Sequence, residues 1–201
     1  MTDTAKQIGA LELFNEKADK LLSLSFVKEL THPKTGILLS GAKNEKGSLD
    51  LTVARKGPSR ESIDAFVLTF RFFIQDNENS SFKNIASVYE KLDNDEFSKS
   101  GFIAARKYIN DFLDSPNGLN ISHNGRRLTN RDILETFVYG GLAHANEEKQ
   151  KIYKEWMEFP PAAALFEAAF VLILGKILNA INYISIINED VIKELKQSTQ
   201  K

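Results

Sequence analysis

Hydrophobic residues recur every three or four positions along most of the chain, which is the spacing of one buried face of an α-helix. Polar breaks and prolines separate these stretches, because proline disfavours helical geometry in the residue before it. The pattern predicts a mainly α fold, a bundle of six to seven helices. The predicted helices cover residues about 4–30, 63–74, 82–92, 102–114, 133–142, 147–159 and 162–193.

Two short stretches follow the alternating pattern of β-strands instead. Between about 36 and 55, apolar residues alternate with polar ones around a polar turn, which predicts a small β-hairpin appended to the helical body. Between about 119 and 128, Asn124 is followed by Gly125, and this pair supplies the two positive-φ residues of a type I′ turn. The second stretch therefore predicts another short ribbon.

The composition is that of a globular protein. A length of 201 residues predicts a single helical domain over residues 1–201, with the hairpin as an appendage. The net charge of -1 gives no general basic excess for nucleic acid, so only a local basic patch is expected. The chain has no cysteine, and its N-terminus lacks a basic segment followed by an apolar one. We therefore expect a cytoplasmic protein without disulfides.

The segment from about 162 to 187 is apolar on nearly every side at its start. A helix that is hydrophobic all round lies at the centre of a bundle or forms half of an oligomer interface, and both readings stay open here. Its longest uncharged run, 168–175, is far shorter than the ~20 residues that span a bilayer, so no membrane-spanning helix is expected. Membrane association through residues 162–187 stays open as a third possibility. The predicted interface residues are Phe166, Phe170, Leu172 and Leu174.

Candidate chemistry concentrates between residues 126 and 156, where three arginines, one histidine, a Gly-Gly pair and the only tryptophan occur together. Thr129 and Asp132 match the N-terminal capping box of the helix in this stretch. Each glycine inside a helix costs about 1 kcal/mol relative to alanine, so the pair predicts either a close backbone contact or a bend or end of the helix. The candidate binding patch comprises Tyr139, Gly140, Gly141, Asn146 and Trp156.

The sequence Tyr-Gly-Gly-Leu-Ala-His at 139–144, near a helix end in an almost wholly helical chain, resembles the HEPN helical-bundle families. Their nuclease members carry an arginine four to six residues before the histidine. The resemblance implies that arginine steadies phosphate charge while histidine acts as acid or base in attack by the RNA 2′-hydroxyl. Here that window, 138–140, holds no arginine. The candidates to accompany His144 are Arg106, Arg126, Arg127 and Arg131.

Helical geometry limits these pairings. Arg131 precedes His144 by thirteen residues, which places them about 140° apart around a continuous helix and ~20 Å apart along it. The two could share a site only if the Gly-Gly pair breaks the helix. A metal site is not expected, because one histidine with Glu147 or Glu148 falls short of the three or four ligands that a stable site needs.

These observations lead to two functional expectations. The first is a non-enzymatic helical interaction or regulatory protein, of the bacterial defence or toxin–antitoxin kind, that binds a protein partner or itself through residues 162–187. The alternative is a HEPN-like, metal-independent endoribonuclease that uses His144 and an arginine, with RNA as its substrate. The sequence contains no phosphate-binding loop, dinucleotide fingerprint or metalloprotease motif, so no cofactor is expected.

Overall fold

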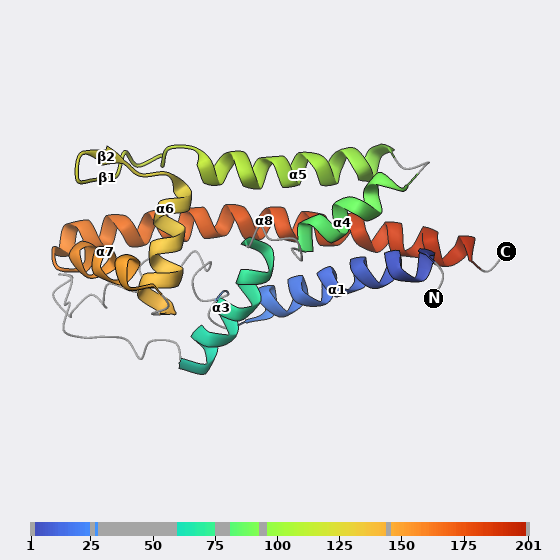
Figure 1. Cartoon of the computed structure of the whole chain (residues 1–201), viewed down its shortest axis with the longest axis horizontal. Helices are drawn as coiled ribbons and strands as arrows, with labels where there is room; N and C mark the ends of the chain where they lie inside the picture. The colour runs from blue at the N-terminus through green and yellow to red at the C-terminus, as the bar shows by residue number, and fades with distance from the viewer. Residues whose placement is uncertain are drawn as a thin grey trace, which may run out of the picture. The chain divides into compact units, whose positions relative to one another are not determined.

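The computed structural model of this chain describes residues 3–24, 27, 60–74, 81–92, 96–143 and 146–199, and it confirms the mainly helical fold (Figure 1). The hairpin predicted at about 36–55 lies outside the described residues. Seven α-helices, one π-helical segment and one two-stranded antiparallel ribbon occur in the described part. They are α1 (Asp3–Ser23), α3 (Arg60–Ile74), α4 (Ser81–Glu90), α5 (Glu96–Asp114), β1 (Ser122–His123), β2 (Arg126–Arg127), α6 (Asn130–Glu135), η1 (Thr136–Leu142), α7 (Glu147–Met157) and α8 (Pro160–Ser198).

Local sequence signals set where several helices begin. Pro160 is the first residue of α8, where its missing N–H costs no hydrogen bond, because the first amides of a helix have no intrahelical acceptor. The Asn146 side chain accepts a hydrogen bond from the Lys149 backbone nitrogen at 2.9 Å and caps α7. Thr129 and Asp132 form a reciprocal capping box at the start of α6, which confirms that prediction.

The second predicted ribbon is confirmed, with strands of only two residues each. β1 pairs with β2 in antiparallel register, and His123 lies opposite Arg126. Asn124 and Gly125 connect the strands with φ angles of 49° and 76°. These positive values are the ones that a type I′ turn requires, so the Asn-Gly pair determined the turn as expected.

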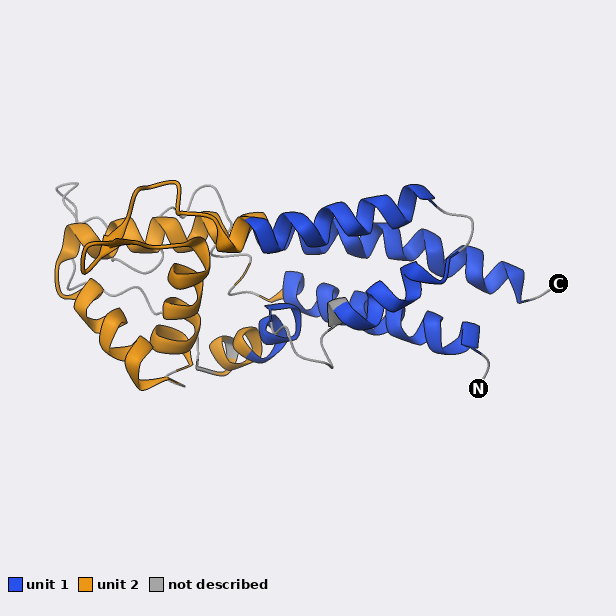
Figure 2. Ribbon diagram, turned by 45° about the horizontal axis from the view of Figure 1, so that its top comes forward, with its two compact units in different colours: residues 1–23, 68–111, 177–201 blue, residues 24–67, 112–176 orange. Residues whose placement is uncertain are grey.

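The chain divides into two compact units, which Figure 2 shows in different colours. Each unit combines segments that are far apart in the sequence, and α8 contributes its first part to unit 2 and the remainder to unit 1. The organisation of the whole chain as one domain stays a prediction. Unit 1 comprises residues 1–23, 68–111 and 177–201, and unit 2 comprises residues 24–67 and 112–176.

Unit 1 packs α1, α4, α5 and the second part of α8 around buried aromatic residues. Phe14 of α1 meets Phe73 of α3 edge to face, with ring centroids 5.1 Å apart. Tyr89 of α4 stacks on Phe102 of α5, with centroids 4.5 Å apart and an interplanar angle of 3°. Buried aromatic rings remove large apolar areas from water, so these pairs contribute strongly to the packing of the unit.

A chain of buried hydrogen bonds runs through the same core. The Tyr89 hydroxyl donates to Asn188 Oδ1 at 2.7 Å, and Asn188 Nδ2 donates to Asn15 Oδ1 at 3.1 Å. Asn15 Nδ2 in turn donates to the carbonyl oxygen of Ser185 at 3.1 Å. Asn188 is fully buried, and a buried polar group without partners costs about 1–3 kcal/mol. The network therefore provides hydrogen-bond partners for the buried polar groups of α8 and joins this helix to α1 and α4.

A second aromatic cluster forms the core of unit 2. Phe137 of η1 stacks on Phe170 of α8 at 4.8 Å and meets Tyr153 of α7 edge to face at 5.3 Å. Trp156 of α7 stacks on Phe166 of α8, with centroids 3.8 Å apart. The first part of α8 is therefore the surface on which η1 and α7 pack.

Candidate functional site

Two buried asparagines hold the base of the ribbon in unit 2. Asn117 Nδ2 donates to the carbonyl oxygens of Ile121 and Leu128 at 2.8 and 2.6 Å, and its Oδ1 accepts from the Ile121 nitrogen at 2.7 Å. Asn130 Nδ2 donates to the Phe112 carbonyl at 2.8 Å. Side-chain amides thus supply the hydrogen bonds that a longer β-ladder would provide, and they fix the position of the two arginines on β2.

The three arginines of this region have partners within unit 2. Arg126 Nη2 lies 3.2 Å from Asp132 Oδ2, and Arg131 Nε lies 2.7 Å from Asp114 Oδ1. Arg127 Nη2 donates to a backbone carbonyl at the ribbon base at 3.0 Å. The Arg126 side chain is still 73% exposed, so this guanidinium stays accessible to a ligand while it pairs with its carboxylate.

The remaining members of the predicted catalytic set are not placed together. Arg106 lies on α5 in unit 1, where it lines a cavity. His144 lies outside the described residues, so the pairing of this histidine with an arginine stays a prediction.

Asp132 is the electrostatic centre of the capping box. Burial by itself would raise the pKa of this carboxyl, but hydrogen bonds from the Thr129 backbone and hydroxyl outweigh that effect, and the charges of Arg126 and Lys149 add to them. The net result is a pKa below the usual range for aspartate. Asp132 therefore stays ionised, holding both the start of α6 and the Arg126 side chain.

The Gly-Gly pair lies in η1, where the helix changes from α to π geometry. The Ala143 nitrogen donates to the Val138 carbonyl, five residues back, at 2.8 Å. A Cβ at Gly140 would overlap the backbone carbonyl group of Lys149 on α7, and one at Gly141 would lie 2.6 Å from the Tyr153 ring. Both sequence alternatives are therefore realised: the helix is distorted, and another backbone packs closely against it.

The five residues of the predicted binding patch mostly serve this packing. Gly140 and Trp156 are buried, and Tyr139 and Gly141 are half-buried. Asn146 is exposed, with its side chain engaged as the cap of α7. Their proximity in the sequence reflects the junction of η1 with α7, and their role as a binding patch stays a prediction.

Trp156 also makes a contact that the sequence did not reveal. Its indole Nε1 donates to His123 Nδ1 at 3.4 Å, although the two residues are thirty-three positions apart in the sequence. The opposite ring nitrogen, His123 Nε2, lies 3.5 Å from Glu155 Oε2. Asn124 Nδ2 lies 3.1 Å from the same Nε2, so the imidazole also contacts the turn of its own ribbon. The histidine thereby docks the ribbon onto α7, and no sequence spacing signalled this long-range contact.

Glu167, the one charged residue in the apolar start of α8, is only 5% exposed and lies in unit 2. Burial raises the pKa of the Tyr153 phenol, and the Glu167 charge raises it further. The phenol therefore stays neutral at physiological pH. This tyrosine supports the packing around the glycines and is poorly suited to act as a base.

The four predicted interface residues divide between core and surface. Phe166, Phe170 and Leu174 are 5%, 0% and 0% exposed, so they pack inside this chain. Leu172 is 57% exposed and is the one of the four that faces solvent. Leu165, which is not one of these four residues, also faces solvent, with 42% of its surface exposed.

These exposed leucines belong to a stripe on the first part of α8. Exposed residues recur there at steps of four, three and four, which places them on one face of the helix. These four are uncharged, and the next exposed residue at this spacing is Lys176. We call this set the α8 stripe, and it consists of Pro161, Leu165, Ala168 and Leu172.

Two further properties bear on the possible chemistry. In the part of the chain that the structure describes, no group of three or more histidine, aspartate or glutamate side chains could hold a metal ion.

α8 is long and apolar enough to cross a membrane, and 56% of its most apolar window is buried within the chain. The core helix of a globular protein meets the same length and composition criteria, so this feature alone is weak evidence for a membrane.

Comparison with models of protein families, with curated proteins and with solved structures finds no match to this chain. Functional proposals therefore rest on the exposure, charge and contacts of its own residues.

The contact at Gly140 leads to a stability prediction. Gly140→Ala should lower the free energy of unfolding by about 1–3 kcal/mol, because the added methyl group forces the η1 and α7 backbones apart. Gly175→Ala is the matched control in the same unit, because a Cβ there meets nothing within 4 Å. It should raise the free energy of unfolding by up to about 1 kcal/mol through helix propensity. Urea denaturation followed by circular dichroism measures both changes, and equal effects of the two substitutions would contradict the close approach.

The lowered pKa of Asp132 leads to a pH prediction. Because its folded pKa lies below the ordinary value of about 3.9, the stabilisation is complete above that value and is lost as pH falls through the folded pKa. The stability advantage of the parent protein over Asp132→Asn should therefore shrink below about pH 4. Thermal unfolding between neutral and acidic pH measures this difference. Asp190→Asn is the control, because Asp190 forms an exposed ion pair with Lys193. This substitution should lower the free energy of unfolding by less than about 1 kcal/mol at neutral pH.

Proposed function

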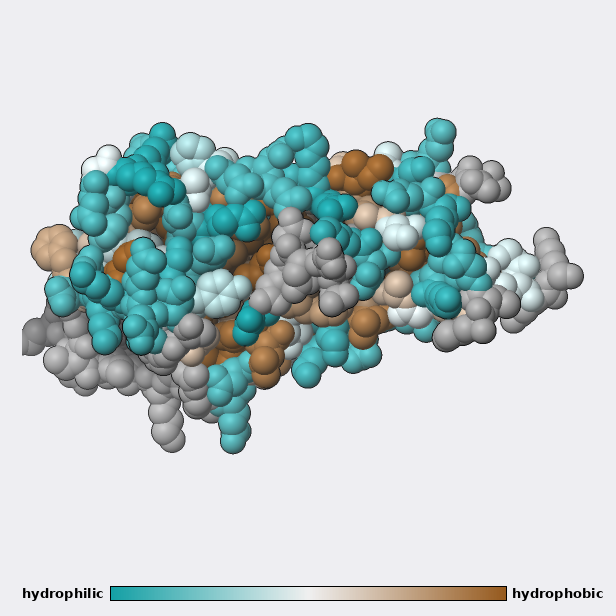
Figure 3. Space-filling view, in the orientation of Figure 1, coloured by the Kyte–Doolittle hydropathy of each residue, from teal (hydrophilic) through white to brown (hydrophobic). Residues whose placement is uncertain are grey.

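We propose that this chain is a non-enzymatic helical interaction protein that associates with a second copy of itself through the α8 stripe. The observation that carries the proposal is the exposure of Leu172 and Leu165 on a helix face whose exposed residues are uncharged from 161 to 172, before Lys176. Figure 3 shows apolar side chains reaching the surface among hydrophilic ones on the face that it draws. Burying the exposed half of each leucine contributes about 1 kcal/mol, which favours covering such a face.

The spacing of the stripe favours a second copy over an unrelated partner. Leu165 and Leu172 lie equally far on either side of the midpoint between Ala168 and Ala169. A two-fold axis at that midpoint, with the helices antiparallel, therefore places each Leu165 opposite the Leu172 of the other copy. The small side chain of exposed Ala168, next to the axis, allows the two helices to approach closely.

A groove beside the stripe offers additional apolar surface in the same unit. It has a volume of about 240 Å³ and is lined by residues that include Leu119, Leu172 and Ile173. Leu119 is 40% exposed at its edge. A leucine side chain from a second copy would be surrounded there by apolar groups. One helix stripe with this groove is smaller than the roughly 1,200 Å² of a stable interface, so the expected dimer is weak.

The dimer is tested by sedimentation at protein concentrations from about one to several hundred micromolar, the range suited to a small interface. The parent chain should pass from monomer to dimer across this range. Leu172→Glu should weaken the association about a hundredfold or more, because two leucines are lost from each dimer and two charges replace them.

Phe97→Glu is the matched control for that substitution. It also replaces an exposed apolar residue, 77% exposed, with a carboxylate, and Phe97 lies in unit 1 away from the stripe in sequence. Its dimerisation should equal that of the parent chain. A parent chain that stays monomeric at several hundred micromolar, or equal weakening by both variants, would rule out the α8 stripe as the dimer surface.

A second candidate function is metal-independent RNA cleavage of the HEPN-like kind. The observation in its favour is the π-helical segment η1, because such distortions occur frequently at functional sites and this one ends two residues before His144. Arg126, with its 73% exposed side chain, is the arginine best suited to meet a phosphate. In this scheme the histidine moves the proton of the RNA 2′-hydroxyl and Arg126 steadies the phosphate.

RNA cleavage is tested with a mixed RNA pool in the presence of a metal chelator. The parent protein should cut the pool, and His144→Ala should lower the rate by at least about a hundredfold, which is the lower end of a general acid or base contribution. Lys151→Ala, which removes an exposed cation of α7, should leave the rate unchanged. Absence of cleavage by the parent, or equal rates for parent and His144→Ala, would eliminate this function.

A further inference from the structure

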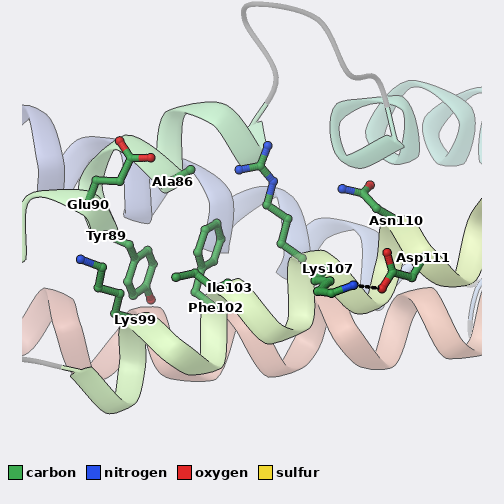
Figure 4. Close-up of a pocket in the computed structure, with 10 residues that line it drawn as sticks. Ala86, Tyr89, Glu90, Lys99, Phe102, Ile103, Lys107, Asn110 and Asp111 are labelled. Atoms are coloured by element: carbon green, nitrogen blue, oxygen red, sulfur yellow. Dashed lines mark hydrogen bonds and ion pairs between the residues drawn. The ribbon is translucent and has the colours of Figure 1, made fainter.

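A cavity of about 320 Å³ opens in unit 1 between α4 and α5 (Figure 4). All of its lining residues belong to these two helices, so it is independent of the α8 stripe and of the arginines in unit 2. Its volume lies at the lower end of the roughly 300–1,000 Å³ of ligand pockets.

The interior of the cavity is aromatic and aliphatic. Tyr89 and Phe102 are each 1% exposed and stack face to face at its base, whereas Ile103, 53% exposed, and half-buried Ala86 provide its accessible apolar surface. The Tyr89 hydroxyl already donates to Asn188 at 2.7 Å in the core. Both rings therefore belong to the core, and a ligand finds its apolar contact mainly on Ile103 and Ala86.

Charged residues occupy the rim and carry a surplus of positive charge. Lys107 and Asp111 form an ion pair with each other, which Figure 4 marks. Of the other charged residues on the rim, Lys99 and Arg106 are positive and only Glu90 is negative, which leaves a net charge of +1. Lys99 and Arg106 are seven residues apart on α5, so they lie on one face of the helix about 10 Å apart along its axis.

From this combination we infer that the cavity binds a small amphiphilic monocarboxylate. Its apolar body lies against Ile103 and Ala86, and its carboxylate meets Arg106 at the rim. One negative charge neutralises the surplus charge of the rim. The planar guanidinium suits a carboxylate, because its two parallel N–H groups match the two oxygens.

The volume sets the size of this ligand. A water-sized group occupies about 30 Å³, so 320 Å³ accommodates about ten such groups. Decanoate has about twelve non-hydrogen atoms, and a pocket typically buries about 70–90% of its ligand. Decanoate is therefore a suitable probe, with decylammonium as a probe of the same length and the opposite charge.

Isothermal titration calorimetry of the full chain with each probe tests the proposal. Decanoate should bind with one site per chain, and decylammonium should bind at least about tenfold more weakly, because the rim repels a second positive charge. Arg106→Gln should weaken decanoate binding by about tenfold to a hundredfold, as expected for the loss of a charge-assisted hydrogen bond. Arg106→Lys should retain part of the affinity, because it keeps the charge.

Two further variants separate binding in this cavity from binding elsewhere. Ala86→Phe fills the apolar interior and should abolish binding while every rim charge remains. Lys151→Gln removes an exposed cation of α7 in unit 2 and should leave the affinity unchanged. Circular dichroism confirms that each variant is folded. Absence of decanoate binding, equal binding of both probes, or unchanged binding by Arg106→Gln or by folded Ala86→Phe would each overturn the proposal.

Discussion

Unit 2 depends on the close approach of two backbones at Gly140. The space between η1 and the Lys149 carbonyl group leaves no room for even a methyl side chain, so α7 lies directly against the π-helical segment. This approach places the Tyr153 ring against Gly141 and lets Trp156 stack on Phe166, so that α7 packs against α8 through aromatic side chains. Glycine at this position is therefore a steric requirement, and the helix-propensity cost of two adjacent glycines is offset by the packing that they permit.

Much of the fold could be predicted because its signals are local. The 3.6-residue periodicity located the helices, Asn124 with Gly125 identified the turn of the ribbon, and Thr129 with Asp132 identified the capping box. Each of these features depends on residues within one or two turns of each other, where backbone geometry and side-chain chemistry are closely linked.

The candidate site could be predicted less well, because it depends on contacts between distant segments. Residue types had pointed to the Gly-Gly stretch as a binding patch, whereas most of its residues are occupied in packing. The start of α8 is apolar on every side, so its sequence did not show which residues face solvent. Phe170 on the buried face and Leu172 on the exposed face are both large apolar residues. Neither the cavity between α4 and α5 nor the His123 contact has a sequence signature, since each needs the helices to be placed in space first.

The hydrogen-bond network of unit 1 has a consequence for specificity. Apolar side chains pack almost equally well when a helix slides along its neighbours by one turn, whereas hydrogen bonds are directional and short. A displacement of α8 would separate Asn188 from both Tyr89 and Asn15 and leave buried polar groups unsatisfied. The network thus selects one axial register of α8 against α1 and α4. Replacing all three side chains with apolar ones of similar volume would preserve burial while removing the feature that distinguishes the correct alignment from its neighbours.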